Sequence, residues 1–185
     1  MNDFEAQLER FFYDPDEDVT DLLELGEEAA APAVGQEPLE EYLTFALGEE
    51  RFLVPLIGVR EVGKVPVLTE IPHAPHGLLG VMGLRGELLP VYDPSCLLGM
   101  TPRPRELAQP DAKPMPREAR VLVLYTYSGD AGLLVDRLLG VVRLPHSAFS
   151  QPGPGVVRSG RASVMALGHH DGKLHCLLDV QELLA

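Results

Sequence analysis

Two parts of the sequence repeat one another. The spacing G-x-L-x4-D-x3-L-L begins at Gly86 and again at Gly172, without insertion or deletion. Two further matches precede it in each half. Val81–Leu84 resembles 164–167, and Leu53, Val54, Val59 and Val62 line up with Leu133, Leu134, Leu139 and Val142. Chance is a poor explanation for three matches, so the sequence predicts a duplicated structural unit.

Each repeated segment has a simple physical interpretation. A glycine suited to a turn is followed by a strand, and an aspartate then precedes a short run that ends in two leucines. Asp93 and Asp179 are expected to cap helical turns by accepting hydrogen bonds from amides, rather than to act in catalysis. Each half has about 60 residues, too few for a large core, so two small barrels packed together are the expected architecture. The groove between such barrels is a natural binding site.

The body of the chain is predicted to be rich in strands. From Tyr42 onward, short runs of valine and leucine are separated by glycine and proline, as is typical of many short strands. The segment from Gly99 to Arg120 breaks this rhythm with repeated prolines and is expected to be an extended connector. We therefore predict a mainly β domain over residues 41–185, with barrels at roughly 41–99 and roughly 120–185.

The acidic residues are concentrated at the N-terminus. Residues 1–41 hold 14 of the 28 Asp and Glu residues but only one basic residue, Arg10, so they account for the whole net charge of -13. This charge balance argues against nucleic-acid binding. Residues 1–40 are expected to be mostly disordered. Two interpretations stay open for this tail, a solvated spacer or a docking motif for an unknown partner, whose apolar helical face would comprise Phe4, Leu8, Phe11 and Phe12.

Several function classes have little support in the sequence. No run approaches the roughly 18 apolar residues of a membrane span, and the first residues do not resemble a signal peptide, so we expect a cytoplasmic protein without membrane insertion. Cys96 and Cys176 are interpreted as small hydrophobic residues. A metal-binding enzyme is the weakest alternative, because adjacent histidines on a strand point to opposite faces. Its candidate ligands are His169, His170, Asp171 and His175. We expect no cofactor and no enzymatic activity.

Short motifs occur in a fixed order along the two halves. They are Leu47–Gly48, Val59–Val62, Leu84–Gly86 and Leu89–Val91, then Gly132–Asp136, Gly140–Val142 and Leu177–Asp179. In this order and spacing, the segment from Tyr42 to Leu184 resembles the CheW family, an adaptor domain that also occurs at the C-terminus of CheA kinases. The resemblance implies two intertwined SH3-like, five-stranded β-barrels with short helices, and no catalysed reaction.

The resemblance also implies partners. One face would bind the regulatory domain of a CheA-type histidine kinase, and the groove between the barrels would receive the hairpin tip of a chemoreceptor. The chain would then be a chemotaxis adaptor recruited to receptor arrays. Two departures from the family pattern, Gly83 in place of asparagine and Pro94 after Asp93, keep a second interpretation open. In that alternative, the protein binds only one of the partners and acts as a decoy or pathway-specific regulator.

Residues on the family's partner-contacting segments define the expected binding site. They are Val59, Glu61, Val62, Gly80, Leu84, Arg85, Val135, Val141 and Val142. The valines have an alternative interpretation as core residues. Glu61 and Arg85 also have an alternative, an ion pair between strands. If that pair were buried, Arg85 would support the fold instead of recognition.

Overall fold

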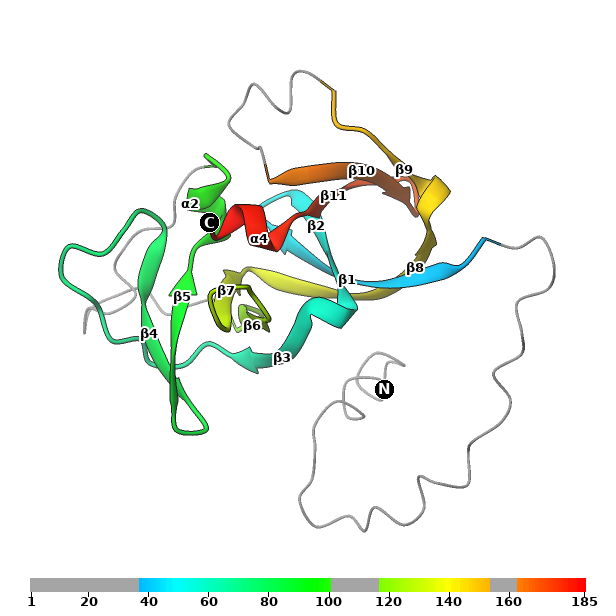
Figure 1. Cartoon of the computed structure of the whole chain (residues 1–185). Helices are drawn as coiled ribbons and strands as arrows, with labels where there is room; N and C mark the ends of the chain where they lie inside the picture. Colours follow the sequence, from blue (N-terminus) through cyan, green and yellow to red (C-terminus); the bar gives the residue numbers. More distant parts are fainter. Residues whose placement is uncertain (1–36, 101–116, 154–162) are drawn as a thin grey trace, which may run out of the picture. The chain divides into compact units, whose positions relative to one another are not determined.

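The computed structural model describes residues 37–100, 117–153 and 163–185 (Figure 1). The chain divides into two units, Met1–Pro38 and Leu39–Ala185, and the described strands and helices belong to the second. The candidate docking motif at Phe4, Leu8, Phe11 and Phe12 lies outside the described residues, as does most of the proline-rich connector. Leu39 and Glu40, which were expected in the tail, already belong to the first strand.

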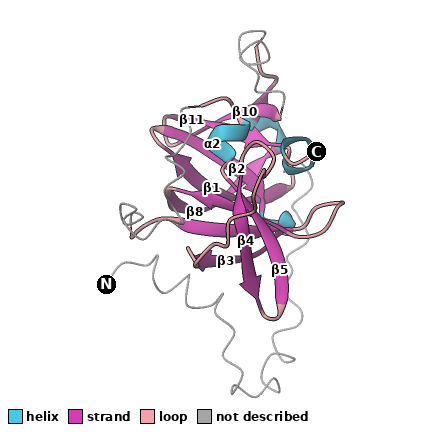
Figure 2. Cartoon of the chain, turned by 90° about the vertical axis from the view of Figure 1, so that its left-hand side faces the viewer, coloured by secondary structure: helices cyan, strands magenta, loops and turns pink. Residues whose placement is uncertain are grey.

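Short strands make up most of the described residues, which confirms the expectation of a mainly β fold (Figure 2). None of the helices in this part of the chain is long and apolar enough to cross a membrane. The strands are β1 (Leu39–Leu47), β2 (Glu50–Pro55), β3 (Val59–Lys64), β4 (Leu78–Leu84), β5 (Glu87–Tyr92), β6 (Arg120–Leu124), β7 (Ala131–Val135), β8 (Arg137–Pro145), β9 (Phe149–Ser150), β10 (Val164–His170) and β11 (Lys173–Leu178). The helical turns are η2 (Leu56–Gly58), α2 (Pro94–Leu97), η4 (His146–Ala148) and α4 (Val180–Leu183).

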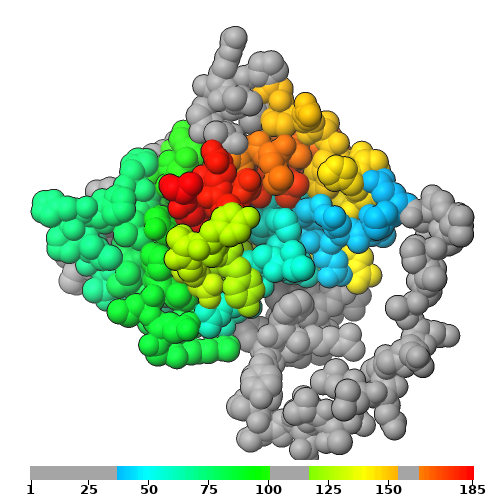
Figure 3. Space-filling model, viewed as in Figure 1, coloured from blue at the N-terminus to red at the C-terminus, as the bar shows by residue number. Residues whose placement is uncertain are grey.

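The strands form two sheets, and each sheet contains strands from both halves of the sequence. The six-stranded sheet has the order β8-β1-β2-β11-β10-β9, and the five-stranded sheet has the order β3-β6-β7-β5-β4. In Figure 3, yellow-green residues of the second half accordingly lie between green and cyan residues of the first half. The observed sheets therefore differ from the expected division into barrels at 41–99 and 120–185. An apolar pattern locates a strand, but it does not specify the strand's partner.

The two sheets share one topology, which turns the sequence repeat into a structural repeat. In the two halves, β1, β2, β3, β4 and β5 correspond in order to β6, β7, β8, β10 and β11. When every strand of the five-stranded sheet is replaced by its counterpart from the other half, the order becomes that of the six-stranded sheet without β9. Each sheet has one parallel pair at the same place, β5 with β7 and β11 with β2. The first two strands of each half therefore belong to the sheet whose other strands come from the other half.

The pairing registers correct two of the three sequence matches. Leu78 pairs with Tyr92 and Val164 pairs with Leu178, so Val164 corresponds to Leu78, three residues before the expected Val81. Val91 lies opposite Gly132 and Leu177 lies opposite Leu53, so Leu53 corresponds to Gly132 rather than to Leu133. Runs of valine and leucine match one another in several registers. The turn glycines and capping aspartates have no such ambiguity, and their match holds.

The two matched glycines belong to tight hairpin turns. Arg85 and Gly86 connect β4 to β5, with φ angles of 48° and 89°. Asp171 and Gly172 connect β10 to β11, with φ angles of 49° and 68°. Two consecutive positive φ angles are what a type I′ turn requires. The interpretation of Asp171-Gly172 as a hairpin turn, rather than as part of a metal site, is consistent with this geometry.

The two matched aspartates cap the short helices, as predicted. The carboxylate of Asp93 accepts a hydrogen bond from the amide of Ser95 at 2.9 Å. The carboxylate of Asp179 accepts hydrogen bonds from the amides of Gln181 and Glu182 at 2.9 and 3.1 Å. Such a cap contributes about 1 kcal/mol, because it satisfies amides that have no partner inside the helix.

The two sheets share one apolar core. Phe45 and Phe52 of the six-stranded sheet stack with their ring centroids 5.8 Å apart. They belong to the same buried cluster as Leu122 and Leu133 of the five-stranded sheet. All four side chains are fully buried. Neither sheet therefore has a complete core of its own, and we expect residues 39–185 to unfold cooperatively.

His175 is a buried polar residue at a position where the two halves differ. It is only 2% exposed and occupies the position that Leu89 has in the first half. Burial lowers the pKa of His175 below its ordinary value. The carbonyl oxygen of Lys173, 3.1 Å from Nδ1, opposes this shift, whereas the charge of Arg51 adds to it. The native state therefore favours the neutral imidazole.

We expect His175→Leu to be less sensitive to acid than the wild-type protein. An unfolded histidine binds a proton near pH 6.5, whereas native His175 resists protonation, so this residue costs stability as the pH falls below about 6.5. Leucine does not titrate and restores the residue type of the first half. The melting temperature of the variant should rise relative to wild type between pH 7 and pH 5. A constant difference over this range would contradict the assignment of a neutral His175.

Candidate partner-binding site

Charged side chains connect β3 to the β4–β5 hairpin. Arg85 Nη2 lies 3.0 Å from Glu61 Oε2, and Arg60 Nη1 lies 2.9 Å from Glu87 Oε2. Arg60 also pairs with Asp130, the residue before β7. β3 and β4 are the two edge strands of the five-stranded sheet, and their backbones do not pair with one another. These side chains therefore connect β3 to the hairpin at the opposite edge of the sheet. We refer to Arg60, Glu61, Arg85, Glu87 and Asp130 as the hairpin cluster.

Arg60 is the central cation of the hairpin cluster. Hydrogen bonds to Glu87 and then to Asp130 raise the pKa of the Arg60 guanidinium further above its ordinary value. Arg60 therefore keeps its charge throughout the range in which proteins are folded. The side chains of Arg60 and Asp130 are partly buried, with exposed fractions of 23% and 21%, whereas that of Glu87 is exposed. This part of the cluster holds the hairpin in place.

Arg85 has a different environment from Arg60. Its side chain is 70% exposed, while that of its partner Glu61 is 23% exposed. The ion pair that was the alternative to partner contact therefore forms. Because one of its side chains is highly exposed, it contributes only about 0–1 kcal/mol. Arg85 also has a positive φ of 48°, a conformation that costs a non-glycine residue about 1 kcal/mol. An exposed arginine in a strained turn contributes little to stability, which leaves it available for recognition.

The structure separates the expected valines into core and surface. Val59 and Val62 pack against the main core, and Val142 packs against a smaller cluster around Tyr42. Val135 has no exposed surface, so the expectation that it contacts a partner is wrong. It is the last residue of a strand whose residues are all buried. Val141 is 44% exposed and is the valine of this set that presents a large apolar surface to solvent.

Gly80 and Leu84, both on β4, also have structural roles. Gly80 is buried with a φ of 151°, and a Cβ atom there would lie 2.5 Å from the carbonyl oxygen of Thr69. The backbone of Thr69 pairs with Val81 through two hydrogen bonds of 2.9 Å, which explains the close approach. Leu84 is partly buried against a cluster of apolar residues within the five-stranded sheet. Gly80 therefore shapes the strand rather than offering a side chain to a partner.

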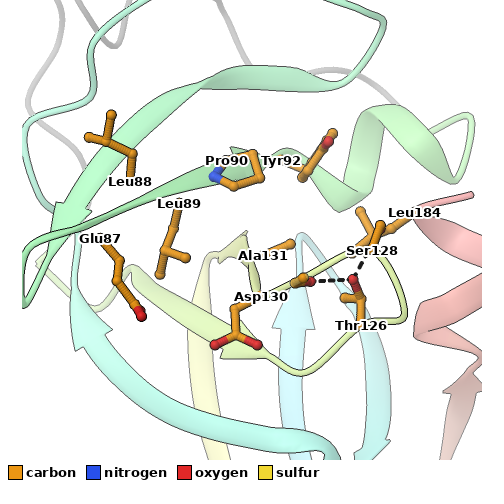
Figure 4. A pocket seen from close by; sticks show the side chains of 11 residues that line it. Glu87, Leu88, Leu89, Pro90, Tyr92, Thr126, Ser128, Asp130, Ala131 and Leu184 are labelled. Atoms are coloured by element: carbon orange, nitrogen blue, oxygen red, sulfur yellow. Dashed lines mark hydrogen bonds between the residues drawn. The ribbon is translucent and has the colours of Figure 1, made fainter.

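A pocket of about 460 Å³ adjoins the hairpin cluster (Figure 4). We refer to it as the junction pocket. In the figure, Glu87 lies at one end of the pocket, and Tyr92 and Leu184 lie toward the other. Leu184 follows α4, which continues from the six-stranded sheet, so the pocket lies where the two sheets meet. The lining residues are Glu87, Leu88, Leu89, Pro90, Tyr92, Thr126, Ser128, Gly129, Asp130, Ala131 and Leu184.

Sequence reasoning expected a groove between the barrels but assigned none of the residues that line the junction pocket to a binding site. They come from β5, the β6–β7 turn and the C-terminal residues, which become neighbours only through the exchange of strands. The one available signal was Leu88, which belongs to the repeated spacing and yet is 77% exposed. A leucine that is repeated without being buried is a candidate contact residue.

An exposed apolar patch lies between the η2 turn and the C-terminal helix. Ile57 is 92% exposed, and Tyr125 and Tyr127 are 53% and 94% exposed. The amide of Tyr125 donates to the carbonyl oxygen of Gly58 at 3.0 Å, which places the first tyrosine beside η2. The amide of Tyr127 donates to Oε1 of Gln181 at 2.9 Å, next to the helix α4. Clustered exposed aromatic and aliphatic residues are typical of protein-binding surfaces.

The histidines of the weakest alternative do not form a metal centre. His170 Nε2 lies 3.4 Å from the carboxylate of Asp171, and its ring lies edge-on to that of His175, with centroids 6.0 Å apart. His175 is buried and its Nδ1 contacts a backbone carbonyl. Within the ranges that the structure describes, no group of three or more His, Cys, Asp or Glu side chains could hold a metal ion.

The chain is similar to known proteins along most of its length. The model of the CheW-like domain family matches residues 41–185. Chemotaxis protein CheW of Rhizobium meliloti is 31% identical over 147 residues, which cover 77% of this chain and 86% of the relative. Protein FrzA of Myxococcus xanthus is 37% identical over 125 residues, which cover 68% and 72%. The crystal structure of scaffolding protein TtCheW from Thermoanaerobacter tengcongensis is similar with a TM-score of 0.66 and 25% identity, covering 79% of this chain and 92% of that one.

Proposed function

The chain belongs to the CheW-like domain family, and we propose that it couples a chemoreceptor to a CheA-type histidine kinase in the cytoplasm. Proteins of this family are scaffolds and adaptors, so the chain is a chemotaxis adaptor and not an enzyme. The expected family and the expected absence of catalysis are thereby confirmed. The two partners are those that the family resemblance implies.

The observation that best supports the coupling proposal is the exposed side chain of Arg85, which pairs with the partly buried Glu61. Both residues were expected at the partner-contacting positions, and their side chains meet at the tip of the β4–β5 hairpin. Arg85 is exposed and strained, and its ion pair is weak, so its replacement should cost the fold little. A partner carboxylate could pair with the free donors of its guanidinium, because an arginine has five N–H groups.

Two surfaces would serve two partners. The hairpin tip and the apolar patch at Ile57, Tyr125 and Tyr127 combine charge with aromatic surface, as protein interfaces do. Val141 supplies exposed apolar surface on β8, in the other sheet. An adaptor must bind both partners at once, and surfaces on different sheets would meet this requirement. Recruitment to receptor arrays follows from such coupling.

We expect Arg85→Ala to weaken binding to the kinase regulatory domain or to the receptor by about tenfold or more, as is typical of an interface arginine. The melting temperature should change little, since the pair that is lost is exposed. Arg143→Ala is the matched control for the loss of an exposed ion pair. Arg143 is equally exposed at 70% and pairs with Glu41 at 2.8 Å, but it lies on the six-stranded sheet. Calorimetric titration of both variants with each purified partner measures the effect.

The outcomes separate the proposal from its alternatives. Binding of both partners by the wild-type protein, with increased kinase autophosphorylation, supports coupling. Binding of one partner alone supports the decoy instead. If Arg85→Ala binds both partners as tightly as the wild-type protein does, the hairpin tip is not a contact surface. A large loss of thermal stability in Arg85→Ala would show that this residue belongs to the scaffold.

A further inference from the structure

Cys96 and His76 form a pair of reactive side chains away from the hairpin cluster. Cys96 Sγ lies 3.0 Å from His76 Nε2, within hydrogen-bond distance, and 3.7 Å from Nδ1. Cys96 is partly exposed, and His76 is exposed. The other cysteine, Cys176, is buried in the main core. The chain thus holds one partly exposed thiol next to a base and one buried thiol.

The fold holds the two side chains together. Cys96 belongs to α2, which Asp93 caps, and His76 lies in the loop that leads into β4. The amide of Asp93 donates to the carbonyl oxygen of Gly77 at 2.8 Å, which joins the loop to the start of the helix. A side chain at Gly77 would collide with Leu97, because its Cβ would lie 2.5 Å from Leu97 Cδ2. The loop is thus packed against the helix at the residue next to His76.

A thiol with this neighbour has a specific chemistry. The nucleophile of a cysteine is its thiolate, and an ordinary thiol is only a few per cent ionised at neutral pH. A histidine within hydrogen-bond distance can accept the thiol proton, and the resulting imidazolium stabilises the thiolate. The sequence alone supported only the interpretation of Cys96 as a small hydrophobic residue. The contact with His76 adds a chemical role to it.

We propose that Cys96 is a site of oxidative modification by peroxide, activated by His76. The sulfur attacks one oxygen of hydrogen peroxide, the S–O bond forms as the O–O bond breaks, and Cys96 becomes a sulfenic acid. The sulfur loses two electrons and the peroxide gains them. The proton that His76 took from the thiol passes to the leaving hydroxide, which departs as water. This inference does not depend on the partners proposed above.

Oxidation at this site has a structural consequence. Oxidation adds a polar oxygen to a sulfur that lies 3.0 Å from His76 Nε2, so it alters the contact between α2 and the loop before β4. Cys176 is buried in the main core, where it is poorly accessible as a resolving thiol. The sulfenic acid therefore persists until a small thiol reduces it or forms a mixed disulfide with it.

The test measures the rate of oxidation of each cysteine in the full chain. The protein is treated with hydrogen peroxide at pH 7, the sulfenic acid is trapped with dimedone, and the peptides that contain Cys96 and Cys176 are quantified by mass spectrometry. In the folded protein, Cys96 should react about tenfold faster than the same cysteine in urea. Cys176 should react only after unfolding. His76→Asn should abolish the advantage of the folded state, whereas His73→Asn, in the same loop, should retain it.

Two results would overturn the proposal. One is a folded Cys96 that reacts no faster than in the unfolded chain. The other is a His76→Asn variant that reacts as fast as wild type while its circular dichroism is native. His76→Gln provides a second variant if the first does not fold, and it should behave in the same way. A role for His76 in packing alone would leave the rate of Cys96 oxidation unchanged.

Discussion

Neither half of this chain is expected to fold without the other. Fragments 1–100 and 101–185 should each lack a cooperative thermal transition, although the repeat gives each of them a full set of strands. The first half contains β1 and β2, whose other neighbours, β8 and β11, are in the second half. It also contains β3 and β5, which need β6 and β7 as neighbours. Each fragment alone would leave strand edges unpaired and Phe45, Phe52, Leu122 or Leu133 exposed.

A single cleavage of the folded protein tests this expectation. A protease site introduced between residues 100 and 117, outside the described strands, should yield two chains that remain associated. Separation in urea should give two unfolded fragments, and their equimolar mixture should regain the circular dichroism and the melting transition. If one fragment folded alone, the pairing of strands across the halves would be wrong. Two independent barrels would predict two separate transitions.

Gly80→Ala is expected to lower the free energy of unfolding by about 2–4 kcal/mol. The new Cβ would lie 2.5 Å from the carbonyl oxygen of Thr69, and the φ of 151° is one that alanine rarely adopts. Relief of the clash would break the two hydrogen bonds between Thr69 and Val81, each worth about 1 kcal/mol. Denaturation in urea gives the difference directly.

Gly83→Ala is the matched control for Gly80→Ala, because it makes the same chemical change on the same strand. Gly83 is exposed and has open space where a Cβ would be. Its replacement should change stability by less than about 1 kcal/mol. Equal effects of the two substitutions would contradict the structural role of Gly80. If Gly80→Ala were stable but failed to bind a partner, Gly80 would return to the binding site.

The candidate site was predictable in part. The Glu61 and Arg85 pair was foreseen because charged residues within apolar strands must reach water, a partner or each other. Its exposure was not foreseen, since exposure depends on how far the hairpin projects beyond β3. For Val135, the sequence predicted surface exposure, whereas the structure shows burial. It resembles a surface residue of the family motif, but β7 lies between β6 and β5 and is buried throughout.

The sequence by itself determined the duplicated unit, the mainly β fold, the hairpin turns and the two capping aspartates. These features depend on local rules, because a turn or a cap is decided by residues within a few positions of one another. Only the tertiary structure decided that the halves exchange strands, which registers match, and which residues meet at the junction pocket and at the Cys96 and His76 pair. Pairing between distant strands is set by packing in the shared core, and no local pattern of valine and leucine specifies it.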